Sequence, residues 1–78
     1  MSIRARELRA TIGENVARLR RERGLTQRQL GALVNDVDGM SISRWERGQN
    51  LPSTEHVVAL AAALGCDLAD LYREPEAA

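Results

Sequence analysis

The chain has 78 residues, enough for one small domain with a single modest core. Hydrophobic residues make up 44% of it, but there is no Phe and only one Tyr and one Trp, so we expect a core of Leu, Val, Ile and Ala on helices. A single cysteine excludes an internal disulfide, and no apolar run is long enough to span a membrane. The Arg-rich, polar N-terminus is unlike a secretory signal, which favours a cytoplasmic location.

The formal net charge is zero, but the charge is unevenly distributed along the chain. Residues 1–50 contain ten Arg and six acidic residues, whereas residues 51–78 contain one Arg and five acidic residues. This asymmetry fits a protein that meets a polyanion with one face, and it fits a solvated surface of mixed charge equally well. All eleven cations are Arg, a residue suited to bidentate contacts with phosphate and guanine.

The first predicted helix covers about residues 5–23. Its apolar residues recur every three or four positions and so share one face: Leu8, Ile12, Val16 and Leu19. Gly24 is placed to cap its C-terminus. A second helix is predicted over about residues 26–34, because Thr26 offers a hydroxyl N-cap and Gln29 completes a capping box. The expected buried face of this helix consists of Leu30, Leu33 and Val34.

The segment of residues 35–39 is rich in Asn, Asp and Gly, which predicts a turn with left-handed backbone. Asp38 is the candidate N-cap of a third helix over about residues 39–47, which Gly48 should end. On this helix Ile42 and Trp45 fall on one face. The other face carries Met40, Ser41, Arg44 and Arg47. A helix this short, docked by two large apolar groups, is predicted to present side chains to a partner.

Two further helices are predicted after Pro52. Ser53 should cap the fourth, with Gly65 at its end and four inward residues: Val57, Leu60, Ala61 and Leu64. Asp67 can cap a last short helix that carries Leu68, Leu71 and Tyr72. We therefore expect an all-α fold of five helices, with one domain over residues 1–73 and a short flexible tail over residues 74–78.

The sequence contains fragments of metal-binding motifs, but none is complete. The residues around Asp36 and Asp38 resemble part of a calcium loop, but Val34 and Trp45 occupy positions that need carboxylates. His56 and Cys66 are too few for a zinc site, and we expect a helix-surface histidine and a small buried thiol. No nucleophilic set or phosphate-binding loop is present. The sequence therefore predicts a protein that is not an enzyme and that holds no metal or cofactor.

The remaining motifs resemble one family. Their residues are Leu25-Thr26-Gln27-x-x-Leu30, Ile42-Ser43-x-Trp45-Glu46-x-Gly48, Pro52 and Leu64-Gly65. In this order and spacing they resemble the phage-repressor-like (XRE, lambda-repressor-like) helix-turn-helix family. The resemblance covers about residues 8–72 and implies a compact five-helix DNA-binding domain. Two departures stand out, because the segment between Leu30 and Ile42 is about one residue longer than usual and Gly39 stands where the family often has Gln.

The resemblance implies roles for individual residues on double-stranded DNA. In this family the third helix enters the major groove, so the base-reading residues would be Met40, Ser41 and Arg44. Arg44 suits the O6 and N7 atoms of guanine, although it could also be a solvated surface cation. The matching phosphate contact would be Gln27. Arg28 beside it, Arg47 at the end of the third helix and Asn50 in the loop are candidates for further phosphate contacts, and Ser43 could contact a phosphate or nothing. Gln27 could alternatively be an ordinary surface residue of its helix.

The resemblance also implies an interior ion pair between Arg20 and Glu46, with a phosphate contact as the alternative for Arg20. Family members usually bind palindromic operators as dimers and regulate transcription. A homodimer would most plausibly use Leu68, Leu71 and Tyr72, left partly exposed in the monomer. We therefore expect a sequence-specific regulator, such as a repressor or a phage or restriction-modification control protein. The alternative is an antitoxin or adaptor that uses the same fold to bind a protein partner such as a toxin.

Overall fold

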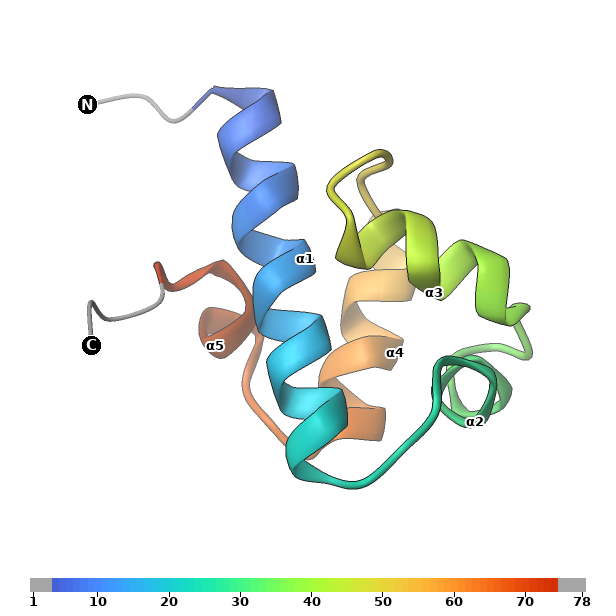
Figure 1. The fold of residues 1–78 in the computed structure, drawn as a ribbon. Helices are drawn as coiled ribbons and strands as arrows, with labels where there is room; N and C mark the ends of the chain where they lie inside the picture. Colours follow the sequence, from blue (N-terminus) through green and yellow to red (C-terminus); the bar gives the residue numbers. More distant parts are fainter. Residues whose placement is uncertain (1–3, 75–78) are drawn as a thin grey trace.

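The computed structural model describes residues 4–74 of the chain, and these residues form five helices and no strand. The helices are α1 (Ala5–Glu22), α2 (Gln27–Leu33), α3 (Gly39–Glu46), α4 (Thr54–Leu64) and α5 (Leu68–Tyr72) (Figure 1). The expected all-α class with five helices is confirmed. Residues 75–78 of the predicted flexible tail lie outside the described residues. No helix in the described part is long and apolar enough to cross a membrane.

The long helix α1 lies between α5 on one side and α2, α3 and α4 on the other, and it packs against α3, α4 and α5 (Figure 1). Ile12, Val16 and Leu19 of its apolar face are buried, and Leu8 packs against the core at the helix start. The helix ends at Glu22, and Gly24 follows with a φ of +67°. Glycine takes this left-handed backbone without steric cost, which lets the chain turn sharply toward α2.

The helices α2 and α3 pack against each other and form the helix-turn-helix. Thr26 and Gln29 form a reciprocal capping box at the start of α2. Asn35 and Asp36 both have positive φ angles in the turn that follows, which Asn and Asp tolerate better than other non-glycine residues. One prediction for α2 is wrong. Leu33 is 57% exposed, because α2 ends there and only Leu30 and Val34 point into the core.

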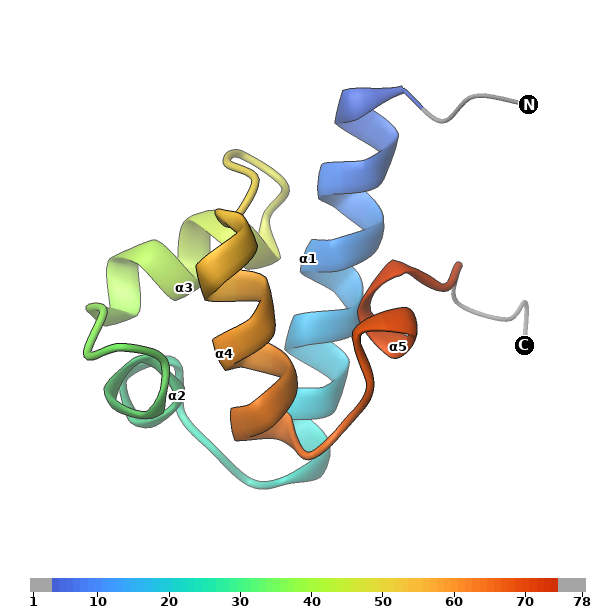
Figure 2. The same cartoon turned by 180° about the vertical axis from the view of Figure 1, so that it is seen from behind.

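The core lies between α1, α3 and α4. Ile42 and Trp45 fix α3 to it, and Val57, Leu60 and Leu64 contribute from α4. In Figure 2, which views the molecule from behind, α4 lies at the centre in the foreground and α3 lies behind it. Ser53 caps α4 by accepting a hydrogen bond from the backbone N–H of His56 at 3.2 Å. Gly65 ends the helix with left-handed backbone. The expected order of buried and capping residues along α4 is confirmed.

The short helix α5 packs against both α1 and α4. Asp67 precedes it, and the backbone N–H of Asp67 donates to the carboxylate of Asp70 at 3.0 Å. The prediction that Leu71 is partly exposed is wrong, because its side chain is completely buried in the core. Leu68 and Tyr72 are exposed on the outer side of the same helix. With only five residues, α5 can bury one large side chain while its neighbours remain in solvent.

A buried polar residue fixes the position of α5. Asn15 of α1 is 1% exposed, and its amide donates hydrogen bonds to the backbone carbonyls of Leu71 and Arg73, both at 2.8 Å. These carbonyls at the end of α5 have no partner within the helix, so the side chain of Asn15 replaces the missing helical donors. Sequence reasoning missed Asn15. The signal was a polar residue placed between Ile12 and Leu19 on an otherwise apolar helix face.

Candidate nucleic-acid interface

The outward face of α3 is the central feature of the candidate interface. Ile42 and Trp45 point into the core, so the helix turns the opposite side chains toward solvent. Met40 is 56% exposed, Arg44 is also exposed, and Ser41 is partly exposed beside them. An exposed methionine and an unburied arginine on one face are poorly explained by packing within this chain. The face is therefore available to a partner.

Three exposed arginines lie on or next to the helices of this face. Arg28 at the start of α2, Arg44 on α3 and Arg47 directly after α3 are all exposed. Within residues 4–74 none of the three forms an ion pair. Arg47 makes one weak contact, from its Nε atom to the backbone carbonyl of Ser43 at 3.3 Å. Unpaired guanidinium groups on one surface favour binding of an anion.

The N-terminus of α3 is capped by Asp38. Its carboxylate accepts a hydrogen bond from the backbone N–H of Ser41 at 2.8 Å. This bond lowers the pKa of Asp38, with a smaller contribution from the positive charge of Arg44, so the group is ionised at neutral pH. The cap fixes where α3 begins. It also places a negative charge close to Arg44.

A hydrogen-bonded network joins α1, α2 and α3 at the other end of the interface. Arg20 of α1 binds both carboxylate oxygens of Glu46, with Nε to Oε2 at 2.6 Å and Nη2 to Oε1 at 3.0 Å. The two side chains are only 12% and 6% exposed. The hydrogen bond to Glu46 is the main cause of the raised pKa of Arg20, and burial opposes it. The pair therefore belongs to the interior of the protein.

Gln27 is part of the same network. Its amide Nε2 donates to Oε1 of Glu46 at 3.0 Å, while Nη1 of Arg20 donates to the carbonyl of Leu25 at 2.8 Å. The first residue of α2 is thereby tied to the last residue of α3. A primary amide has a second N–H and a carbonyl oxygen, so Gln27 keeps the capacity to bind another group. Sequence reasoning missed the bond between Gln27 and Glu46.

The other predicted contact residues lie along the rim. Ser43 is partly buried on α3, and Asn50 is exposed in the loop between α3 and α4. Thr26 and Ser53 cap the starts of α2 and α4, so both hydroxyls already accept a hydrogen bond from the backbone.

His56 was expected on the surface, but it is partly buried with its ring 5.0 Å from that of Trp45. This contact extends the packing around α3 into α4.

Two glycines that sequence reasoning missed allow close backbone contacts, Gly13 between α1 and α3 and Gly31 between α2 and the turn that follows it. A Cβ atom at Gly13 of α1 would overlap the backbone carbonyl oxygen of Trp45 and would lie 2.7 Å from that of Glu46. A Cβ atom at Gly31 of α2 would overlap the carbonyl oxygen of Val37. Glycine in a helix interior is unfavourable by itself, and this was the available signal for a close approach.

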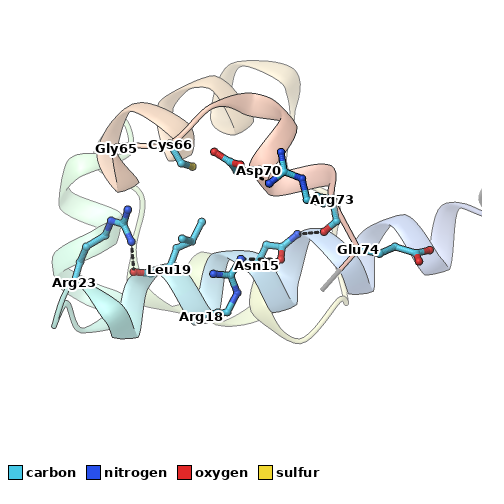
Figure 3. A pocket seen from close by; sticks show the side chains of 9 residues that line it. All are labelled: Asn15, Arg18, Leu19, Arg23, Gly65, Cys66, Asp70, Arg73 and Glu74. Carbon is cyan, nitrogen blue, oxygen red and sulfur yellow. Dashed lines mark hydrogen bonds and ion pairs between the residues drawn. The ribbon is translucent and has the colours of Figure 1, made fainter. Parts of the chain in front are cut away.

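A hollow between α1 and α5 lies apart from this interface (Figure 3). Three of its polar side chains already have partners, because Arg18 pairs with Glu22, Arg73 pairs with Asp70, and Asn15 binds two carbonyls. Cys66 lines it, and burial, assisted by nearby negative charge, raises the pKa of this thiol. The expected buried thiol is in fact only partly buried. Within residues 4–74, no three His, Cys, Asp or Glu side chains gather to hold a metal.

Comparison with known proteins identifies the family. A family model described as "Helix-turn-helix" matches residues 16–71, and the chain belongs to this family. The resemblance inferred from the sequence motifs is thereby confirmed. A curated relative, the HTH-type transcriptional regulator y4dJ of Sinorhizobium fredii, is 38% identical over 65 residues, which cover 83% of each chain. The class defined by the fold is that of helix-turn-helix transcriptional regulators.

Two further relatives are similar in sequence and structure. The repressor protein C2 of Salmonella phage P22 is 36% identical over 70% of this chain, which corresponds to 25% of the repressor. A crystal structure of the P22 c2 repressor with a synthetic operator matches with a TM-score of 0.75 and 34% identity, covering 80% of this chain and 92% of that one. The crystal structure of the restriction-modification controller C.AhdI of Aeromonas hydrophila matches with a TM-score of 0.77 and 30% sequence identity. The match covers 82% of this chain and 96% of that one. These relatives are regulators rather than enzymes.

Proposed function

We propose that this protein is a sequence-specific DNA-binding regulator of transcription that places α3 in the major groove of its operator. The observation that carries the proposal is the group of unpaired arginines, Arg28, Arg44 and Arg47, around the exposed face of a helix docked by Ile42 and Trp45. The P22 c2 repressor, which has a similar fold, has been crystallised with an operator. The major groove of B-DNA admits one α-helix, and the second helix of a helix-turn-helix is the one that enters it.

In this arrangement three residues of α3 read base pairs. Arg44 donates two hydrogen bonds to O6 and N7 of a guanine, while Met40 packs against the methyl group of a thymine. Ser41 can bind either a base or a phosphate. Only Arg44 carries a charge, and a bidentate contact is the most discriminating of the three interactions. We therefore expect Arg44 to dominate the sequence preference.

The surrounding polar residues hold the backbone of the duplex. Arg47, Asn50 and Ser43 flank the C-terminal part of α3, and Gln27 uses its second amide N–H together with the first turn of α2. Contacts of this kind fix register and orientation without reading sequence, and they make the affinity depend on salt. They account for part of the affinity and none of the direct base preference.

We further propose that the protein binds a palindromic operator as a homodimer. The exposed apolar side chains of Leu68 and Tyr72 on α5 form the proposed contact. Buried Leu71 supports α5 from inside and does not reach a partner. Two copies related by a two-fold axis would place their recognition helices in successive major grooves, with half-site centres about 34 to 36 Å apart.

The deciding experiment is selection of bound sites from random duplex DNA at physiological salt, with wild type and Arg44→Ala in parallel. We expect the wild type to enrich a palindrome and Arg44→Ala to lose one guanine preference per half-site, with about 1 to 3 kcal/mol less discrimination. Arg47→Ala should weaken binding to all sequences alike. Arg18→Ala is the matched control, because it removes the same charge from the side of α1 that faces α5.

Failure to enrich any sequence with the wild type would contradict the proposal. A protein-interaction role, as an antitoxin or adaptor, would then gain support, and its activity should be insensitive to Arg44→Ala. Equal losses on every sequence for Arg44→Ala and Arg47→Ala would contradict the assignment of Arg44 to a base.

A further inference from the structure

The start of the recognition helix lies directly against Arg28 of α2. Gly39 is the first residue of α3 and has no side chain. A Cβ atom placed on Gly39 would lie 3.5 Å from the backbone N, 3.6 Å from the Cα and 3.8 Å from the Cβ of Arg28. The side chain of Arg28 therefore begins beside the start of α3, and Gly39 adds no side chain to the hollow that both residues line. This is the end of α3 that enters the groove in helix-turn-helix proteins.

The side chain of Arg28 has no polar partner in the described part of the chain. It is exposed, and within residues 4–74 it forms neither an ion pair nor a side-chain hydrogen bond. It lines one hollow together with Met40, which is a base-reading residue in the proposed complex. A long, free guanidinium group beside that residue can reach the same stretch of major groove.

The charges around this hollow favour a guanine base over a DNA phosphate as the group that Arg28 contacts. Asp36 and Asp38 line it as well, and Asp38 is held as an ionised helix cap. A phosphate brought here would meet two carboxylates of its own sign, which is unfavourable even at a solvated surface. A guanine edge is neutral overall and offers two acceptors in the geometry that a guanidinium fork matches.

We infer that Arg28 reads a guanine from the space left by Gly39, at a base pair different from the one read by Arg44. The inference rests on the proposed function, since it requires α3 to lie in the major groove. It changes the expected role of Arg28 from a phosphate contact to a specificity-determining residue. The recognition surface then includes one residue of α2 in addition to α3.

The test is site selection from random duplexes with wild type, Arg28→Ala and Arg28→Gln. Arg28→Ala should reduce discrimination at one base pair about 5- to 150-fold and leave the guanine read by Arg44 unchanged. Arg28→Gln should change the preferred base at that pair from guanine to adenine, because the amide of Gln matches N6 and N7 of adenine. Arg47→Gln is the matched control and should change no base preference. Thermal unfolding should be unchanged in all variants, since both arginines are exposed.

Each result of the selection bears on the inference. If Arg28→Ala and Arg28→Gln weaken every site equally and leave the selected sequence intact, Arg28 contacts phosphate and the inference is wrong. The proposed function would still stand in that case, because the wild-type palindrome and the effect of Arg44→Ala would remain. If the wild type selects no sequence, the proposed function fails and this inference fails with it.

Discussion

Glu46 connects three parts of the interface through one carboxylate. It receives two hydrogen bonds from Arg20 and one from Gln27, so α1, the start of α2 and the end of α3 meet at a single buried anion. Ion pairs of this kind contribute little net stability compared with an apolar replacement, but losing one partner leaves a buried charge unmatched. The cost of changing Glu46 should therefore far exceed that of changing a surface acid.

We expect Glu46→Ala to lower the free energy of unfolding by about 3 to 5 kcal/mol, because Arg20 would remain as a largely buried, unpaired cation. Urea unfolding followed by circular dichroism measures this change. Glu22→Ala is the matched control, since it removes the same group from ion pairs that are half exposed, and it should cost less than about 1 kcal/mol. Similar losses in the two variants would show that the pair of Arg20 and Glu46 is not effectively buried.

At single residues the sequence predicted partners better when a motif specified them. The pairing of Arg20 with Glu46 and the caps at Thr26, Asp38 and Ser53 were expected, and the structure brings these groups together. The bond from Gln27 to Glu46 could not be predicted, because it depends on how far α2 lies from the end of α3. Leu33 was assigned to the wrong environment for a similar reason, since helical spacing does not determine how wide the covered face is.

Among whole elements, local chemistry determined the ends of the helices. Each of α2, α3 and α4 begins after a Thr, Asp or Ser cap, and α4 ends at a left-handed glycine, so their bounds lay within about one residue of the predicted ones. The close approach of α1 to α3 at Gly13 had only a weak local signal, namely a glycine inside a predicted helix. It arises from tertiary packing, in which the backbone of one helix meets the carbonyl end of another.

The substitution Gly13→Ala tests the close contact between α1 and α3. Alanine favours a helix by about 1 kcal/mol over glycine, yet here its methyl group would overlap the carbonyl of Trp45, so we expect a net loss of about 1 to 3 kcal/mol. Thermal unfolding provides the measurement. Gly39→Ala is the control, because its methyl group would make only ordinary contacts near 3.5 Å and stability should stay within about 0.5 kcal/mol of the wild type. A stabilised Gly13→Ala variant would show that α1 and α3 are not in close contact.

For the molecule as a whole, the uneven charge of the sequence corresponds to a spatial arrangement. Arg28, Arg44 and Arg47 belong to the helix-turn-helix, whereas four acidic residues of the described chain follow in α4 and α5 or beside them: Glu55, Asp67, Asp70 and Glu74. From the sequence alone this arrangement could not be distinguished from an evenly mixed surface. The helices that carry the two groups could be predicted, whereas their placement relative to one another depends on tertiary packing.

The proposed dimer is also a property of the whole molecule. We expect Leu68→Glu to shift sedimentation from dimer to monomer, because it would place a charge in the apolar contact formed by Leu68 and Tyr72. Val58→Glu on α4 is the matched control, since Val58 is similarly exposed but lies outside the proposed contact. Wild-type protein that remains monomeric at high concentration and binds one copy per operator would contradict the dimer.

The two hydrogen bonds of Asn15 have a consequence for operator geometry. Gly13 and Asn15 lie within one turn of α1, and they fix α3 and α5 respectively. The contacts that α1 makes with α3, the proposed DNA-reading helix, and with α5, the proposed dimer contact, thus lie close together on one turn of α1. In the proposed dimer, the distance between half-sites would be determined by the relative placement of α3 and α5. Adaptation to a differently spaced operator would require new side chains on the outer face of α5, because α5 itself cannot pivot while Asn15 holds its end.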